Sequence, residues 1–162
     1  MKKSAQVHKG FTLVELLVVI AIIAILAAVV VLIINPLELT RRGRDAARLT
    51  DLANLQQAIN VAVQEATQSG QNIACNGASG VCVSRSHIDT RVTNGTGWVQ
   101  INFGVQTSVS VPTLPVDPTN NSANHYTYCG SSDSWQIFTD LESTQQSPKE
   151  GTDGGQDLAK YE

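Results

Sequence analysis

The sequence predicts an α+β protein in which one long N-terminal helix packs on a small antiparallel β-sheet head. Two observations carry this prediction. The strongly apolar residues are concentrated in residues 11–34, whereas the rest of the 162-residue chain is rich in Ser, Thr, Asn, Gln and Gly. In the C-terminal half, short apolar stretches bounded by turn residues follow one another, which is typical of strands.

The apolar block is long enough to cross a membrane. Its 24 residues would form a helix of about 36 Å, against roughly 30 Å of bilayer hydrocarbon. Eighteen of them are Phe, Leu, Ile or Val, which together favour insertion by roughly 5 to 11 kcal/mol. Glu15 costs at most about 3 kcal/mol, so we expect a transmembrane helix over residues 11–34.

Three interpretations of this block compete. A cleaved secretory signal has a shorter apolar region of roughly 7–15 residues that ends in a small-residue site, whereas Asn35 and Pro36 follow here. A plain signal anchor that holds an extracytoplasmic binding protein at the membrane is the second interpretation. The third explains two further features, a charge inside the apolar run and a Gly-Phe junction directly before it.

The junction combines a basic leader, a glycine, an aromatic residue, an acid four residues later and a long apolar run. It reads Lys9-Gly10-Phe11-Thr12-Leu13-Val14-Glu15-Leu16-Leu17-Val18-Val19-Ile20. This segment resembles the type III signal of type IV prepilins and type II secretion pseudopilins. The resemblance implies a pilin fold, a leader (residues 1–10) that prepilin peptidase removes after Gly10 on the cytoplasmic side, and N-methylation of Phe11.

The resemblance also implies a function and partners. We expect a structural subunit of a type IV pilus that forms a homo-oligomeric helical filament through its N-terminal helix. A pseudopilin of a type II secretion or competence system is the alternative within the family. The implied partners are prepilin peptidase, the assembly platform with its ATPase-driven machinery, and the lipid bilayer. Three lysines precede the apolar block and four arginines follow it, so the resemblance, rather than charge, sets the N-terminus in the cytoplasm. The final location is then an extracellular pilus or a periplasmic pseudopilus.

Glu15 has a predicted role in assembly. Phe11 and Glu15 are four residues apart, so in a helix they would share a face. A carboxylate in hydrocarbon needs a partner or a proton. Cleavage would create an amine at Phe11, and the amine of an incoming subunit would pair with Glu15 of a subunit already in the filament, which fixes register. The alternative is that Glu15 only reaches the membrane interface.

A helical pattern resumes after the block, over residues 35–67. Its apolar stripe comprises Leu49, Leu52, Leu55, Ile59, Ala62, Val63 and Ala66. Pro36 and Gly43 predict a hinge or an ordinary kink. The arginines lie off the stripe; they would bind lipid headgroups, face the acidic head of a neighbouring subunit, or pair along the helix as Arg41–Asp45 and Arg48–Asp51. They are Arg41, Arg42, Arg44 and Arg48.

The remaining chain divides into a connecting loop (68–97), an antiparallel β head (98–142) and an acidic flexible tail (143–162). The loop is turn-rich, with a short extended piece near Val81–Val83 and a helical turn near His87. Strands are predicted over residues 98–103, 126–129 and 135–139, of which the last two form a hairpin.

Three cysteines leave at least one thiol outside a bond within the chain. The pairing is either Cys75–Cys82, with Cys129 free, or one in which Cys129 takes one of the two. Asp117, Asp153 and Asp157 are weak calcium candidates, because oxygen ligands beside Gly turns suit Ca²⁺. Segments around Asp117 and Asp153 are similar to blocks of pilins and of major pseudopilins. Major pseudopilins carry a calcium site. The ligands cannot be matched here, so no cofactor is expected.

No catalytic constellation stands out, so an enzyme is not expected. His87 and His125 are isolated in polar loops, and no Gly-rich phosphate loop occurs. The net charge of −3 gives no case for direct nucleic-acid binding. Asn94-Gly95-Thr96 and Asn120-Asn121-Ser122 match the N-glycosylation pattern, although chance matches are expected in a Ser/Thr-rich head.

Overall fold

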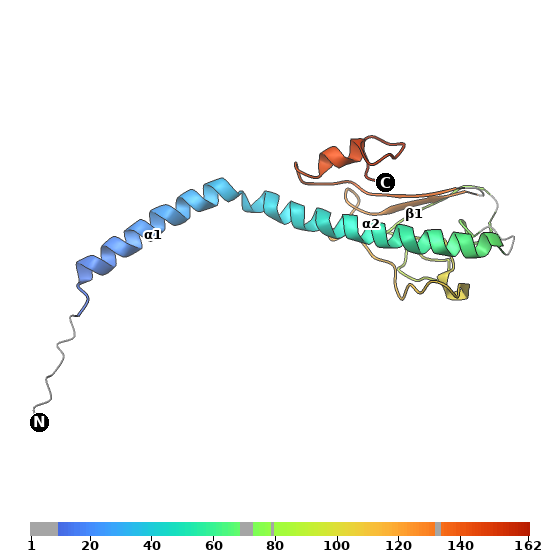
Figure 1. Cartoon of the computed structure of the whole chain (residues 1–162), viewed down its shortest axis with the longest axis horizontal. Coiled ribbons are helices and arrows are strands. Elements are labelled where there is room, and N and C mark those ends of the chain that lie inside the picture. Colours follow the sequence, from blue (N-terminus) through green and yellow to red (C-terminus); the bar gives the residue numbers. More distant parts are fainter. Residues whose placement is uncertain (1–9, 69–72, 79, 132–133) are drawn as a thin grey trace, which may run out of the picture. The chain divides into compact units, whose positions relative to one another are not determined.

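The computed structural model describes residues 10–68, 73–78, 80–131 and 134–162. The expected leader up to residue 9 lies outside this part of the chain. The elements are α1 (Leu13–Ile34), α2 (Pro36–Gln68), β1 (Cys82–Arg85), β2 (Thr127–Gly130) and β3 (Trp135–Phe138), with 3-10 turns η1 (Phe103–Val105) and η2 (Ser147–Gly151) (Figure 1). The fold is α+β, as the sequence predicts. The chain forms two compact units, of which the second is Thr40–Glu162.

Helix α1 contains the apolar block. Its 22 residues give a length of about 33 Å, enough to cross the hydrocarbon of a bilayer. None of its residues is buried. At its C-terminal end Asn35 adopts a left-handed conformation (φ 43°), which stops the helix.

Helix α2 begins directly afterwards, with Pro36 at its first position, where the missing N–H costs nothing. From Asp45 onward its buried positions recur at three- and four-residue steps. They are Asp45, Arg48, Leu52, Leu55, Ile59, Ala62 and Ala66. The prediction that Arg48 lies off the stripe is therefore wrong, and Leu49 is only half-buried.

The sheet has the order β1-β2-β3, and both neighbouring pairs are antiparallel. The predicted hairpin of β2 and β3 is present, with Tyr128 opposite Ile137. The third strand is not residues 98–103 but β1, which lies where the sequence indicated only a short extended piece. Tyr128 and Ile137 belong to one apolar core with Leu55 and Ile59 of α2, so the sheet covers the helix stripe.

Residues 98–103 are mostly buried but do not form a strand, since only an isolated antiparallel bridge joins Asn102 to Asn94. The hydrogen bonds of Trp98 go to loops: its backbone N–H donates to the Thr90 carbonyl (2.9 Å), and its indole Nε1 donates to the Pro115 carbonyl (2.8 Å). The segment therefore contributes its apolar side chains to the core as irregular backbone.

The C-terminal segment folds back on the sheet rather than hanging free as the expected flexible tail. Thr139 and Tyr161 form an antiparallel bridge with two backbone hydrogen bonds, of 3.0 and 2.9 Å. Lys160 pairs with Asp140. The Glu162 backbone N–H donates to Asp153 (2.7 Å), which ties the end of the segment to its middle.

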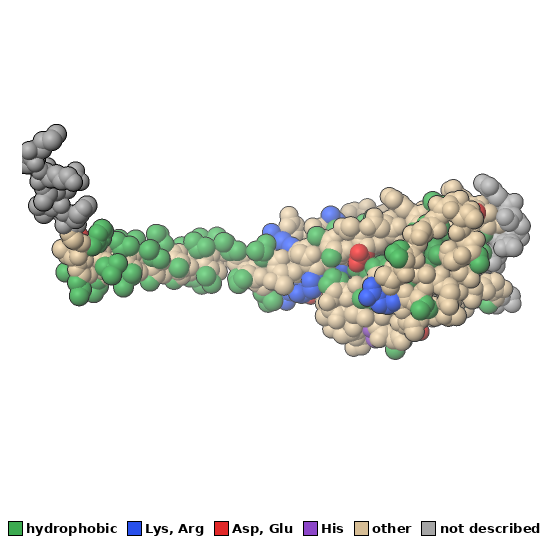
Figure 2. Space-filling model, turned by 90° about the horizontal axis from the view of Figure 1, so that it is seen from below, with side chains coloured by type: hydrophobic (Ala, Val, Ile, Leu, Met, Phe, Trp, Pro, Cys, Tyr) green, Lys and Arg blue, Asp and Glu red, His purple; other side chains and the backbone are tan. Residues whose placement is uncertain are grey.

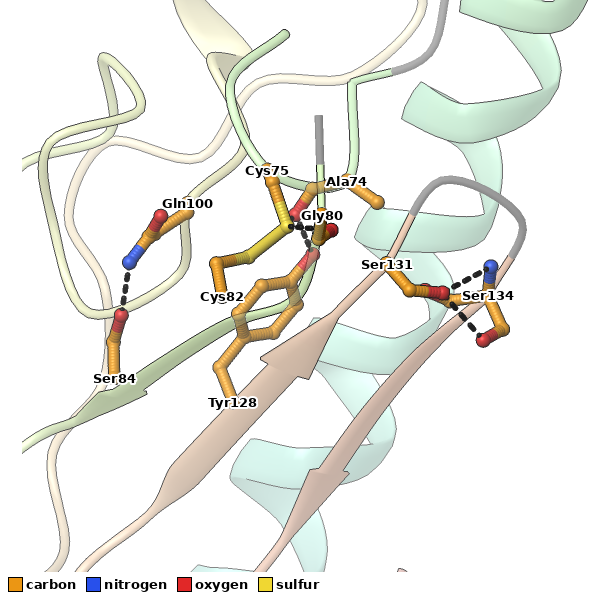
Figure 3. Close-up of a disulfide and its surroundings, with 9 residues drawn as sticks. All are labelled: Ala74, Cys75, Gly80, Cys82, Ser84, Gln100, Tyr128, Ser131 and Ser134. Carbon is orange, nitrogen blue, oxygen red and sulfur yellow. Dashed lines mark hydrogen bonds between the residues drawn. A yellow bond between two sulfur atoms is a disulfide. The ribbon is translucent and has the colours of Figure 1, made fainter. Parts of the chain in front are cut away.

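A disulfide joins Cys75 to Cys82 and so closes the loop in front of β1 (Figure 3). The Tyr128 hydroxyl donates to the Ala74 carbonyl (2.5 Å) beside it. Gly130, which is paired with Cys82 across the strands, fits against this group because it has no side chain. A Cβ there would clash with the Ala74 carbonyl oxygen and lie 2.9 Å from the Cys82 Sγ.

We therefore predict that Gly130→Ala lowers the free energy of unfolding by about 1–3 kcal/mol through overpacking. Gly43→Ala is the matched control: a Cβ there meets nothing within 4 Å, and alanine favours the helix by up to about 1 kcal/mol. Denaturant unfolding of the protein in detergent measures both. Equal stabilities of the two variants would contradict this account of the disulfide region.

Candidate functional site

The Gly10–Phe11 junction precedes the first helical turn. Gly10, Phe11 and Thr12 have no helical assignment, and the Phe11 side chain is 80% exposed. The interpretation of Phe11 and Glu15 as residues on one helix face is thus wrong in this structure, because α1 begins only at Leu13. The exposed, non-helical peptide bond between Gly10 and Phe11 is accessible to a processing enzyme.

Glu15 is held by the start of its own helix. Thr12 is the N-cap residue: its hydroxyl accepts a hydrogen bond from the Glu15 N–H (3.3 Å). In return, the Glu15 Oε2 accepts from the Thr12 N–H (2.8 Å) and hydroxyl (2.5 Å). This reciprocal arrangement is a capping box. The pattern Thr-x-x-Glu before an apolar run is its sequence signal, which the predictions from the sequence did not include.

The surface of α1 is apolar apart from Glu15 in its first turn. Figure 2 shows hydrophobic side chains along its length. Its large side chains are exposed by 45% to 83%. Of the helices in the described ranges, α1 is the one long and apolar enough to cross a membrane.

The predicted hinge residues occupy different positions. Pro36 follows the break at Asn35, and the Asn35 Oδ1 accepts a hydrogen bond from the Glu38 N–H (3.4 Å), so Asn35 caps the start of α2. Gly43 lies inside α2, which runs through it without interruption. The helical conformation is therefore interrupted at Asn35, beside Pro36, and not at Gly43.

A buried cluster of ions joins α2 to the head. The Arg48 side chain is fully buried, and its guanidinium donates to Asp117 (2.5 and 3.0 Å), Asp45 (2.7 Å) and Glu142 (2.5 Å). Arg44 forms a second, bidentate ion pair with Glu142. The sequence pointed these arginines outward and suggested the pair Arg48–Asp51, which the structure contradicts.

The cluster keeps its carboxylates ionised. The Arg44 guanidinium, with help from Arg48, lowers the pKa of Glu142 to about 2. Burial raises the pKa of Asp117, but the Arg48 guanidinium and the backbone N–H groups of Thr119 and Asn120 outweigh it, so the pKa lies below the usual value. Burial also raises the pKa of Asp45, but hydrogen bonds from the Glu142 and Ser143 backbone N–H groups outweigh it, so this pKa is lowered as well.

The three calcium candidates are engaged separately. Asp117 lies in the Arg48 cluster. Asp153 accepts from the Gly155 and Glu162 N–H groups, and Asp157 accepts from the Ala159 N–H. In the described ranges, no three His, Cys, Asp or Glu side chains are arranged to hold a metal ion.

Cys129 is unpaired, as the Cys75–Cys82 alternative predicted, whereas the two histidines differ from the prediction. Cys129 is a free, half-buried thiol whose pKa is raised by burial. It faces away from the disulfide, because Cys82 lies opposite Gly130 and neighbouring strand residues point to opposite faces. The two histidines are not isolated: the rings of His87 and His125 lie 4.3 Å apart, and burial lowers the pKa of His125.

Comparison with known proteins identifies the N-terminal region alone. Residues 6–31 match the family model described as the prokaryotic N-terminal methylation motif. The match covers the leader end, the Gly10–Phe11 junction, Glu15 and most of α1. No curated protein and no solved structure matches the chain.

We predict that Arg48→Met destabilises the protein by about 3–5 kcal/mol at neutral pH, because it leaves buried carboxylates without their cation. The loss should shrink as the pH falls, since those carboxylates can then take up protons. Lys149→Met, at an exposed position, is the control and should stay within about 0.5 kcal/mol of the parent. A loss of stability that does not change with pH would show that lost packing, and not unpaired charge, causes the destabilisation.

The pKa of Glu142 predicts an acid-sensitive fold. Its folded value of about 2 lies below the ordinary 4.5, so its stabilising contribution is complete above pH 4.5 and is lost as the pH falls toward 2. Glu142→Gln should therefore flatten the dependence of unfolding free energy on pH across this window. Asp140→Asn, outside the cluster, should leave the slope as it is. The measurement is denaturant unfolding at several pH values.

Proposed function

Because this chain carries the N-terminal methylation motif of type IV pilin and pseudopilin precursors, we propose that it is a structural subunit of a type IV pilus. Prepilin peptidase cuts it after Gly10, and the new terminus at Phe11 is methylated. The apolar helix anchors the subunit in the cytoplasmic membrane until the assembly machinery moves it into the filament. The observation that carries the proposal is the motif at the start of an apolar helix none of whose residues is buried by the described part of the chain.

The surface of α1 supports this order of events. Burying one large apolar side chain stabilises by roughly 1.5–3 kcal/mol, and α1 exposes such side chains from Leu13 to Ile34. Lipid meets this demand for the single subunit. The α1 helices of identical neighbours meet it in a filament, so the same residues serve both states.

Glu15 supports a registered assembly. Its carboxylate already accepts two hydrogen bonds from Thr12, and a carboxylate has room for about four. Removal of the leader converts the Phe11 nitrogen into an ammonium group. We propose that this group, on an incoming subunit, binds Glu15 of a subunit already in place. A wrong register would leave the carboxylate unpaired among apolar side chains, at a cost of several kcal/mol.

The head supports a structural rather than a catalytic role. Its core is closed around α2 by the sheet and by the Arg48 cluster, so its buried charges are paired with one another. A pseudopilin of a secretion or competence system shares these features and differs in where its fibre ends. A membrane-anchored binding protein would share α1 but would keep its first ten residues.

The mass of the mature N-terminus separates these classes. We predict that protein from cells with an active prepilin peptidase begins at Phe11 and carries one methyl group on that nitrogen. Top-down mass spectrometry measures both changes. An intact Met1 would instead identify an uncleaved anchor and would rule out the proposed function.

We further predict that Glu15→Val inserts in membranes as well as the parent, because it removes a charge from an apolar helix, but assembles at least tenfold fewer fibres. Glu38→Val, which changes a half-buried carboxylate in the first turn of α2, is the matched control and should assemble normally. Membrane fractionation and fibre counts by electron microscopy provide the readouts. Normal fibres from the Glu15 variant would refute the pairing.

A further inference from the structure

Two tripeptides in the head match the acceptor pattern Asn-x-Ser/Thr for N-linked glycans, and the structure separates them. Both Asn94 and Thr96 are exposed at the surface of the loop that precedes Trp98. Asn120, in the second match, is part-buried against Ser86. We propose that Asn94 is a glycosylation site and that Asn120 is not.

The geometry at Asn94 suits the chemistry. The Asn94 Oδ1 accepts hydrogen bonds from the Thr96 N–H (3.1 Å) and hydroxyl (2.8 Å). Both bonds draw electron density toward the oxygen and so make the Nδ2 protons more acidic, which eases removal of one of them by a base of the transferase. Among the described residues, none accepts a hydrogen bond from the Asn94 Nδ2, and the residue is exposed.

The middle residue of the tripeptide holds this turn. Gly95 has φ 88°, a conformation that favours glycine, and a Cβ there would lie 2.5 Å from the Asn76 Oδ1. A surface hollow adjoins the asparagine, so a bulky group has room. It is lined by Arg91, Val92, Thr93, Asn94, Pro112 and Thr113.

The second match lacks these features. The Asn120 Oδ1 accepts from the Ser86 hydroxyl (2.8 Å), and its Nδ2 donates to the Ser86 carbonyl (3.2 Å). Its amide therefore ties the turn after β1 to the loop before β2. A glycan on Asn120 would have to break both bonds, and Ser122 forms neither of the contacts that Thr96 forms at the first match.

The donor has to be a sugar activated as a lipid-linked pyrophosphate. The Asn94 Nδ2 attacks the anomeric carbon, a C–N bond forms, and the C–O bond to the pyrophosphate breaks. The lipid pyrophosphate leaves with the electron pair, and the amide proton passes to a base of the transferase. No oxidation or reduction takes place. The inference rests on the proposed function in one respect, because it needs the head on the outer side of the membrane.

Peptide mass spectrometry of full-length protein from the cells that make it tests the site. We expect a glycan on the peptide that contains Asn94 and none on the peptide that contains Asn120. Thr96→Ala should lower the occupancy at least tenfold, Thr96→Ser should retain it, and Ser122→Ala should not change it. Thermal unfolding of the variants checks that each one folds.

The same spectra distinguish the two claims. A bare Asn94, or one converted only to aspartate, in protein that begins at methylated Phe11 would overturn the glycosylation site and leave the proposed function standing. Glycan that persists in Thr96→Ala would also overturn the site. A glycosylated Asn94 on protein with an intact Met1 would support the site while refuting the processed subunit.

Discussion

The architecture depends on one constraint, which is that the described part of the chain buries none of the residues of α1. Its 22 consecutive residues are helical, and all but Glu15 are apolar. In water such a surface is unfavourable by many kcal/mol, so in the proposed function a lipid bilayer or other copies of the helix cover it. Every other feature of the N-terminal region fits this demand: the capping box starts the helix, and Asn35 ends it once the span is complete.

The head meets the opposite requirement, because it has to be stable whatever covers α1. Its stripe on α2 is apolar from Leu52 onward, but it begins with the ion pair of Asp45 and Arg48. Asp117 and Glu142 complete the cluster from loops distant in sequence, so Arg48 fixes where these loops meet the helix. Buried charges of this kind contribute specificity when every partner is present and cost several kcal/mol when one is missing.

The sequence predicted what depends on local pattern. A 24-residue apolar run indicates a spanning helix without further information, and the turn between β2 and β3 identifies a hairpin. It could not predict that Arg48 is buried. An arginine is expected to face solvent unless carboxylates pair with it, and the sequence does not show that three carboxylates meet Arg48 in the fold. The predicted strand over residues 98–103 was wrong for a similar reason. These residues are apolar because they fill the core as irregular backbone, and a buried coil has the same composition as a strand. The capping box, by contrast, was readable as Thr12-x-x-Glu15.

The central claim is that α1 passes from lipid into a bundle of identical helices. Electron cryomicroscopy of fibres purified from the cell surface tests it most directly. The account predicts density for this polypeptide from Phe11 onward, with α1 helices of neighbouring subunits packed along the fibre axis and the heads outside. Fibres that lack the chain, or that carry it with α1 facing solvent, would contradict it.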